Sequence, residues 1–211
     1  MRTIVAGVFM TLDGVVQDPG GFGETDHGGW ALPYFDEAAQ ETSTEQVRAS
    51  DVFLLGRRTY EILQRAWSTN TGPYAEALHE IPKVVVTNTL SGSLPWNATA
   101  LSGDPAQTVA SLEGNVLIYG SFALVRTLLQ HQLIDQLHIG VYPVFLGSGR
   151  RLFEGAAPGK LRLVGAAQLP SGVVSLTFRR RVRRARGATA AGSSSAPPRA
   201  VLEKRHLSRS G

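Results

Sequence analysis

The sequence predicts an α/β domain in which helices cover both faces of a mostly parallel sheet that ends in an antiparallel hairpin. Short runs of aliphatic residues alternate with helix-forming segments from residue 3 to residue 142, which is the order that builds a parallel sheet. Near the C-terminus, Pro170-Ser171-Gly172 separates two apolar stretches, a pattern typical of a hairpin. We therefore expect a three-layer α-β-α sandwich.

Seven segments rich in Val, Ile and Leu are expected to form the strands. The first, TIVAGVFM, is apolar almost throughout, as a strand buried on both faces should be. In the last, Val174, Leu176 and Phe178 alternate with more polar neighbours, which gives the two-residue period of a strand. The expected strands span residues 3–10, 52–55, 83–87, 116–119, 137–142, 161–169 and 173–181.

Four helices are expected between these strands. Residues 33–49 are rich in Ala, Glu and Gln, and Asp36 with Glu37 would favour the dipole of their first turn. Asp104-Pro105 supplies a capping residue and a proline at the first helical position. The apolar residues after Ser121 recur at helical spacing. The expected helices span residues 33–49, 59–66, 105–112 and 121–131.

The charge of the chain divides it into two parts. The 211 residues carry a formal charge of +4, yet residues 179–211 hold ten basic residues and one acidic residue, while residues 1–178 hold eleven and sixteen. Residues 183–211 are also rich in Arg, Ala, Ser, Gly and Pro and lack the apolar surface that would offset their ordering entropy. We expect one domain over residues 1–182 and a disordered basic tail over 183–211.

Composition excludes several classes of site. Cysteine is absent, which excludes disulfides, thiolate metal sites and a cysteine nucleophile. His27, His79, His131 and His138 lack the spacing of metal ligands, so no metal is expected. No apolar run is long enough to span a bilayer and no signal peptide is evident, so we expect a cytoplasmic protein.

Ligands of a parallel sheet bind outside the carboxyl ends of its strands, which directs attention to residues 12–17, 56–60, 87–89 and 120–124. In Gly56-Arg57-Arg58-Thr59 the backbone N–H groups of a helix start and two arginines can hold a phosphate. The alternative is a turn with solvated arginines.

Two further segments at these strand ends have similar alternatives. Gly120 would let a cofactor lie against the backbone and Ser121 would face a pyrophosphate, although a simple serine cap is the simpler interpretation of Ser121. Thr87, Asn88 and Thr89 either contact a ribose or phosphate or form a turn.

Asp13 ends the first strand, where its carboxylate would bind sugar hydroxyls, guide a proton or simply cap a turn. Residues 146–151 are also glycine-rich, but Leu152 replaces the third glycine of a dinucleotide fingerprint and Leu146 the first glycine of a hydrolase elbow. Both of those motifs fit poorly.

The motifs taken together resemble a known family. They are VAGVFMTLDGVV, DVFLLGRRTYE, PKVVVTN, VLIYGSFALVRTLL, LIDQLHIGVYPVFLGSGRRLF and GVVSLTFRR, and they span residues 1 to about 181. In this order they resemble the dihydrofolate reductase superfamily, in the branch of the C-terminal reductase domain of riboflavin-biosynthesis proteins. The resemblance implies a dihydrofolate reductase-like fold and an enzyme that takes a hydride from NADPH.

The resemblance also implies a set of cofactor residues. Val8, Phe9, Val16 and Gln17 would line the nicotinamide pocket. Gly56, Arg57, Arg58 and Thr59 would lie at the adenosine side, with an arginine on the 2′-phosphate, and Thr87 and Asn88 would approach the adenosine ribose. Gly120, Ser121, Phe122, Ala123 and Leu124 would surround the pyrophosphate, and Gly147 to Gly149 would close the cofactor edge.

The sequence departs from true folate reductases at two points. Ser121 stands where they have the second of two glycines, and the acidic residue after the Trp-x-Leu-Pro stretch comes one position late, at Asp36. One helical position rotates a side chain by ~100°, so Asp36 would miss a pterin. Asp13 instead resembles the riboflavin branch, where it would hold the substrate ribose.

The leading hypothesis is therefore an NADPH-dependent reductase that converts a ribosylamino-pyrimidine phosphate to its ribitylamino product. Asp13 would orient the sugar, Asp36 or a water would deliver the proton, and Trp30, Phe35 and Trp67 are candidates for stacking on a planar heterocyclic substrate. A bifunctional role is not expected because no deaminase segment accompanies the domain.

Three alternatives remain open: a pterin or dihydrofolate reductase, a nucleotide-binding protein without turnover, and nucleic-acid binding through the basic tail. The resemblance also implies a homodimer.

Overall fold

The computed structural model describes residues 2–180, and these form one nine-stranded sheet with five α-helices. The strands are β1 (Thr3–Thr11), β2 (Val52–Gly56), β3 (Lys83–Val86), β4 (Gly92–Leu94), β5 (Ala98–Leu101), β6 (Asn115–Tyr119), β7 (Gln136–Tyr142), β8 (Leu161–Gln168) and β9 (Val174–Arg180). The helices are α1 (Glu37–Arg48), α2 (Arg57–Trp67), α3 (Pro73–Glu80), α4 (Pro105–Ala110) and α5 (Phe122–Gln130). The predicted end of the domain at residue 182 and the predicted tail over 183–211 lie outside the described residues.

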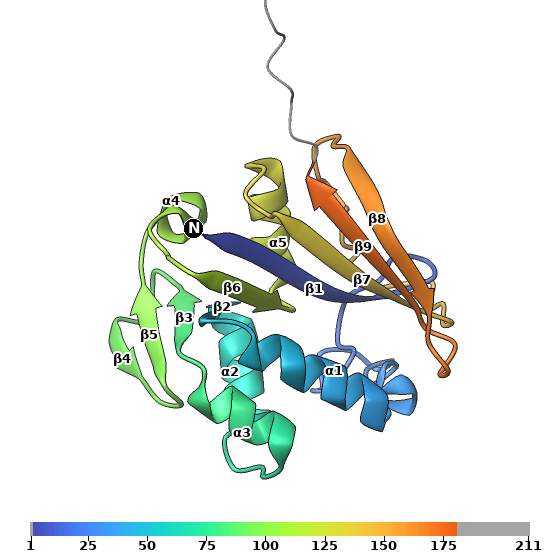
Figure 1. Ribbon diagram of the computed structural model, residues 1–211, viewed down its shortest axis with the longest axis horizontal. Coiled ribbons are helices and arrows are strands. Elements are labelled where there is room, and N and C mark those ends of the chain that lie inside the picture. Colours follow the sequence, from blue (N-terminus) through green and yellow to red (C-terminus); the bar gives the residue numbers. More distant parts are fainter. Residues whose placement is uncertain (1, 181–211) are drawn as a thin grey trace, which may run out of the picture. The chain divides into compact units, whose positions relative to one another are not determined.

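The sheet confirms the predicted topology. Its order is β4-β5-β3-β2-β6-β1-β7-β9-β8. The six strands from β5 to β7 pair in parallel, whereas β9 pairs antiparallel with both β7 and β8. Figure 1 shows this C-terminal hairpin at the edge of the sheet opposite β4 and β5.

Helices cover both faces of the sheet, as the apolar strands predict. Leu54 of β2 packs with Val109 of α4 and Val125 of α5 on one face. Its neighbours Phe53 and Leu55 pack on the other face, against side chains of α1, α2 and α3. Figure 1 shows α1, α2 and α3 together on that side. Adjacent residues of one strand thus enter different cores, which is why the strand is apolar without alternation.

The region around the first helix differs from the prediction of one helix over residues 33–49. Leu32–Tyr34 form a short 3-10 helix, and α1 begins at Glu37. Asp36 has an extended backbone and its carboxylate accepts a hydrogen bond from the N–H of Ala39, so it is the N-cap and not a residue of the first turn.

Helix α3 and the two strands of the β4–β5 hairpin escaped the prediction. Helix α3 begins directly after Gly72 with proline at its first position, a start signal that the sequence does contain. The β4–β5 hairpin turns through Trp96 and Asn97, which both have positive φ values of 64° and 52°. Turns in which two consecutive residues have positive φ favour Asn and Gly. With Trp96 at one of these positions, the sequence does not show the usual residues of such a turn.

Candidate active site

A large cavity lies where the carboxyl ends of β1, β2 and β6 meet. These three strands are neighbours in the sheet. The cavity has a volume of about 410 Å³, within the range of ligand pockets. It lies at the edge of the sheet that the parallel topology predicts.

The cavity brings together most of the predicted cofactor residues. Twelve of the fifteen line its wall: Val8, Phe9, Val16, Gly56, Arg57, Arg58, Thr59, Gly120, Ser121, Phe122, Ala123 and Leu124. They come from β1, from the segment after β1 and from the starts of α2 and α5. Residues up to 116 positions apart in the chain are therefore assembled by the sheet order into one wall.

Gln17, Thr87 and Asn88 lie outside this wall. The Gln17 side-chain oxygen accepts from the N–H of Arg150 at 3.2 Å. The Asn88 side-chain oxygen accepts from the N–H of Gly103 at 3.0 Å. Thr87 is buried, and its hydroxyl accepts from the N–H groups of Thr89 and Leu90. The Thr87 contacts form a local turn, as the alternative interpretation of residues 87–89 holds, whereas Gln17 and Asn88 join segments that are 133 and 15 positions apart in the chain.

The starts of α2 and α5 share an unusual property. Within residues 2–180, no side chain at the cap position accepts a hydrogen bond from the first N–H groups of either helix. Gly56 precedes α2 and has no side chain to offer. The predicted role of Ser121 as a side-chain cap is wrong, because its Oγ instead accepts from the N–H of Gly56 at 2.8 Å. The first N–H groups of both helices consequently remain available toward the cavity.

The backbone around Gly120 is shaped for close approach. Gly120 has a φ of +62°, and a Cβ there would lie 3.3 Å from Cγ2 of Thr59. Ser121 follows with a left-handed backbone of its own, φ 49°, and its N–H donates to Oγ1 of Thr59 at 3.1 Å. Two consecutive left-handed residues turn the chain sharply from β6 into α5, so backbone lines the cavity at that point.

The two arginines at the start of α2 are paired with carboxylates. Arg57 donates from Nε to Glu61 at 2.7 Å and from Nη1 to the Thr89 hydroxyl at 2.7 Å. Nε of Arg58 lies 2.6 Å from Oε1 of Glu24. Both have charged partners, yet their side chains are 48% and 62% exposed, so the alternative interpretation of solvated arginines is also compatible with the structure.

A second, smaller cavity of about 180 Å³ adjoins the first. It lies between α1 and strands β1, β7 and β9, and the residues common to both cavities are Gly7, Val8, Phe9, Phe35, Ser43 and Tyr119. The Tyr119 hydroxyl donates to Oε1 of Gln46, and burial raises the pKa of Tyr119. Burial lowers the pKa of His138, which lines the second cavity. Burial thus favours the uncharged form of both side chains.

The predicted substrate and catalytic residues do not all lie at one site in the structure. Phe35 lines both cavities and Asp36 lines the second. Trp67 lines the larger cavity, where its ring packs edge-on against Tyr74. Trp30 is buried, its indole N–H donates to the Gln17 carbonyl at 2.8 Å, and its ring packs edge-on against Tyr142.

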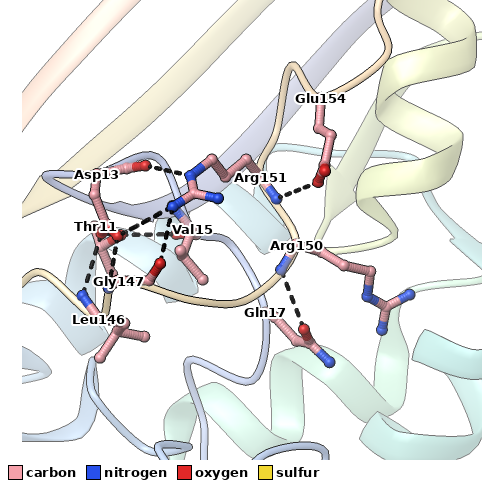
Figure 2. A network of polar contacts seen from close by, with 9 residues as sticks. All are labelled: Thr11, Asp13, Val15, Gln17, Leu146, Gly147, Arg150, Arg151 and Glu154. Carbon is pink, nitrogen blue, oxygen red and sulfur yellow. Dashed lines mark hydrogen bonds and ion pairs between the residues drawn. The ribbon is translucent and has the colours of Figure 1, made fainter.

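Asp13 lies in a polar network between β1 and residues 146–151, shown in Figure 2. Its carboxylate accepts from the Thr11 hydroxyl at 2.6 Å and from the N–H groups of Gly147 at 2.9 Å and Leu146 at 3.3 Å. Nη2 of Arg151 lies 3.6 Å from Oδ2 of Asp13. The Thr11 hydrogen bond, followed by those of the two backbone N–H groups, lowers the pKa of Asp13 below its usual value. The contacts seen for this carboxylate are structural, and a role toward substrate stays a prediction.

Sequence reasoning missed several side chains that line the cavities: Glu24, Gln46, Tyr74, Tyr119, His138 and Arg150. Arg150 follows Gly147-Ser148-Gly149, so the glycine-rich signal was present without pointing to its arginine. The other positions carry no local motif, because the packing of a loop, two helices and the strands brings them to the cavities.

Comparison with known proteins identifies the family. The sequence model of the RibD C-terminal domain matches residues 2–175. The chain belongs to the RibD C-terminal domain family. The uncharacterized protein YyaP of Bacillus subtilis (strain 168) is 25% identical over 187 residues, and the match covers 84% of this chain and 94% of YyaP.

Solved structures share the fold of this RibD C-terminal domain. A putative riboflavin biosynthesis protein from Shewanella sp. PV-4 superimposes with a TM-score of 0.62 at 19% identity, covering 85% of this chain and 99% of the other. Dihydrofolate reductase from Enterococcus faecalis superimposes with a TM-score of 0.55 at 15% identity, covering 85% and 97%. The predicted dihydrofolate reductase-like fold is confirmed.

Within residues 2–180, no three His, Asp or Glu side chains gather as metal ligands would. None of the helices in the same residues is long and apolar enough to cross a membrane.

Proposed function

We propose that the protein is an NADPH-dependent reductase of the riboflavin-biosynthesis type, acting on a ribosylamino-pyrimidine phosphate or a close relative. One observation carries the proposal: the starts of α2 and α5, both without a side-chain cap among the described residues, line a single cavity together with arginines. A dinucleotide needs such N–H groups and cations for its phosphates.

The residues of the cavity fit NADPH. Gly120, Ser121 and Phe122 would hold the pyrophosphate against the backbone of α5, where Gly120 leaves room that a Cβ would reduce. Arg57 or Arg58 would pair with the 2′-phosphate, and a guanidinium distinguishes that group from a bare hydroxyl. Val8, Phe9 and Val16 would form the apolar pocket for the nicotinamide. NADPH, when bound, supplies a hydride.

The second cavity is the proposed place of the substrate. It shares Val8, Phe9 and Phe35 with the larger one, so a planar heterocycle there would adjoin the nicotinamide pocket and contact the Phe35 ring. Asp36 lines this cavity and is exposed, which suits a group that passes a proton between solvent and substrate. The predicted homodimer stays a prediction.

The first test is a fluorescence titration of the full chain with NADPH and with NADH. We expect tight NADPH binding that Arg57→Ala or Arg58→Ala weakens by about tenfold, the size of one lost charge-assisted contact. Arg65→Ala is the matched control, because Arg65 is exposed at the other end of α2. The proposal is contradicted if neither NADPH nor NADH binds.

Turnover then identifies the substrate class. NADPH oxidation is followed with the ribosylamino-pyrimidine phosphate and, in parallel, with dihydrofolate. Oxidation with the pyrimidine alone agrees with the proposed reaction. Oxidation with dihydrofolate alone assigns the protein to pterin reduction instead, and binding without turnover of either substrate contradicts the proposed reaction.

A further inference from the structure

Three charged side chains meet at the wall of the larger cavity: Glu24, Arg58 and Arg150. Oε1 of Glu24 lies 2.6 Å from Nε of Arg58 and 4.0 Å from Nη2 of Arg150. The Glu24 side chain is only 11% exposed, whereas Arg58 and Arg150 are 62% and 45% exposed. Two guanidinium groups thus converge on one shielded carboxylate oxygen.

The chain fixes the backbone that carries this carboxylate. Asp18 is buried, and its carboxylate accepts hydrogen bonds from the N–H groups of Phe22 at 2.6 Å, Glu24 at 2.9 Å and Thr25 at 3.1 Å. Three bonds to one carboxylate define the course of residues 18–25. The position of Glu24 is therefore set by its own loop and does not depend on the ion pair alone.

Arg150 is oriented independently of Glu24. Its guanidinium lies 4.8 Å from the ring centre of Phe122, the first residue of α5. Its backbone N–H donates to the Gln17 side chain. A cation that stacks on an aromatic ring keeps its N–H groups directed outward in its plane, and here they face the oxygen of Glu24 beside the start of α5.

We propose that Arg58 and Arg150 form an anion subsite for a phosphate group of the ligand, and that Glu24 is an internal occupant that this phosphate displaces. The proposal rests on the proposed function only for the identity of the molecule that carries the phosphate. A dianionic phosphate offers three acceptor oxygens to two guanidinium groups, more than the single oxygen of Glu24 that lies between them. Glu24 therefore lowers the affinity for ligands that bear a phosphate, and leaves ligands without one unaffected.

The test compares Glu24→Gln with the unchanged protein in calorimetric titrations of inorganic pyrophosphate, NADPH and adenosine. Removal of the competing carboxylate is expected to tighten the binding of pyrophosphate and NADPH by about fivefold, the size of a partly exposed ion pair. Adenosine affinity stays unchanged. Glu41→Gln is the matched control, because Glu41 is exposed on α1 and its substitution changes the net charge equally.

The Arg150→Gln variant tests whether the effect of Glu24→Gln depends on the subsite. In Arg150→Gln the gain from Glu24→Gln is expected to shrink, because one of the two cations of the subsite is gone. Glu24→Ala should repeat the effect of Glu24→Gln, and a circular dichroism melt of each variant checks that it is folded.

The outcomes separate this inference from the proposed function. Equal NADPH affinity of the unchanged protein and Glu24→Gln overturns the inference and leaves the cofactor in place. Tighter pyrophosphate binding by Glu24→Gln without NADPH binding supports the anion subsite and contradicts the proposed cofactor. An equal gain in Glu41→Gln, or no pyrophosphate binding by any variant, overturns the inference.

Discussion

Helices α4 and α5 begin in opposite ways. At α4, the Asp104 carboxylate accepts from the N–H groups of Ala106 at 2.6 Å and Gln107 at 3.2 Å. At α5, the Ser121 hydroxyl turns away from its own helix and accepts from Gly56, 65 positions earlier in the chain. Both helices follow strands of the same sheet, yet only the start of α5 lines the cavity. Among residues 2–180, a side chain thus caps the helix that starts away from the cavity, and none caps the helix that starts at its wall.

The same contrast extends to other carboxylates. Asp36, Asp18 and Asp13 all accept hydrogen bonds from backbone N–H groups, at α1, at residues 22–25 and at residues 146–147. These carboxylates stabilise local structure. The starts of α2 and α5 meet arginines and glycines instead, so the same kind of backbone group has a structural role in one place and faces the cavity in the other.

The largest effect is expected for Ser121→Asp, which would place a carboxylate at the start of α5. The added negative charge would occupy the N–H groups and repel phosphate, so NADPH affinity should fall about 100-fold. Fluorescence titration measures it. Ser121→Ala is the control, since it removes the hydrogen bond to Gly56 without adding charge. Unchanged affinity in Ser121→Asp would mean that this helix start does not face the ligand.

Asp18→Asn tests a carboxylate with a structural role. The amide would direct N–H groups at backbone N–H groups, so we expect a loss of about 2 kcal/mol in the free energy of unfolding. Urea denaturation measures the loss. Asp26→Asn, an exposed change in the same segment, should have little effect. Equal effects of the two changes would contradict the role assigned to Asp18.

Asp104→Ala removes the side-chain cap of α4. Removal of the cap should lower the free energy of unfolding by about 1 kcal/mol. NADPH affinity should not change, because α4 starts outside the cavity. Thermal melts and the same titration are sufficient. A loss of NADPH binding would show that the two helix starts are not separate in function.

Asp13→Asn is expected to have the smallest effect on stability, under about 1 kcal/mol. The pKa of Asp13 is lowered in the folded chain from its usual value of 3.8. The stabilising effect of the carboxylate is thus present above that value and lost as the pH falls through the folded pKa. Melts at pH 7 and pH 3 should show the difference between Asp13→Asn and the unchanged protein shrinking in acid. Unchanged turnover in this variant would contradict the predicted role toward a substrate sugar.

Much of the fold could be predicted because its signals are local. Asp104-Pro105 identified a helix start from two residues, and Pro170-Ser171-Gly172 identified the C-terminal turn. The start of α1 was misplaced by four residues, because Ala, Glu and Gln favour a helix across the whole segment while Pro33 and the Asp36 cap decide where it begins. The β4–β5 hairpin was missed because its turn uses Trp96 in a left-handed conformation that tryptophan rarely adopts.

Most strands, most helices and the glycine-containing segments between them follow from the sequence alone, since hydrophobic period and capping chemistry act over a few residues. Tertiary structure decided which of these segments meet. Ser121 bonds to Gly56, Glu24 pairs with Arg58, and Arg150 stacks on Phe122 only because the strand order brings β1, β2 and β6 side by side. Hydrogen bonds and ion pairs depend on distances in space, and a local pattern does not record them.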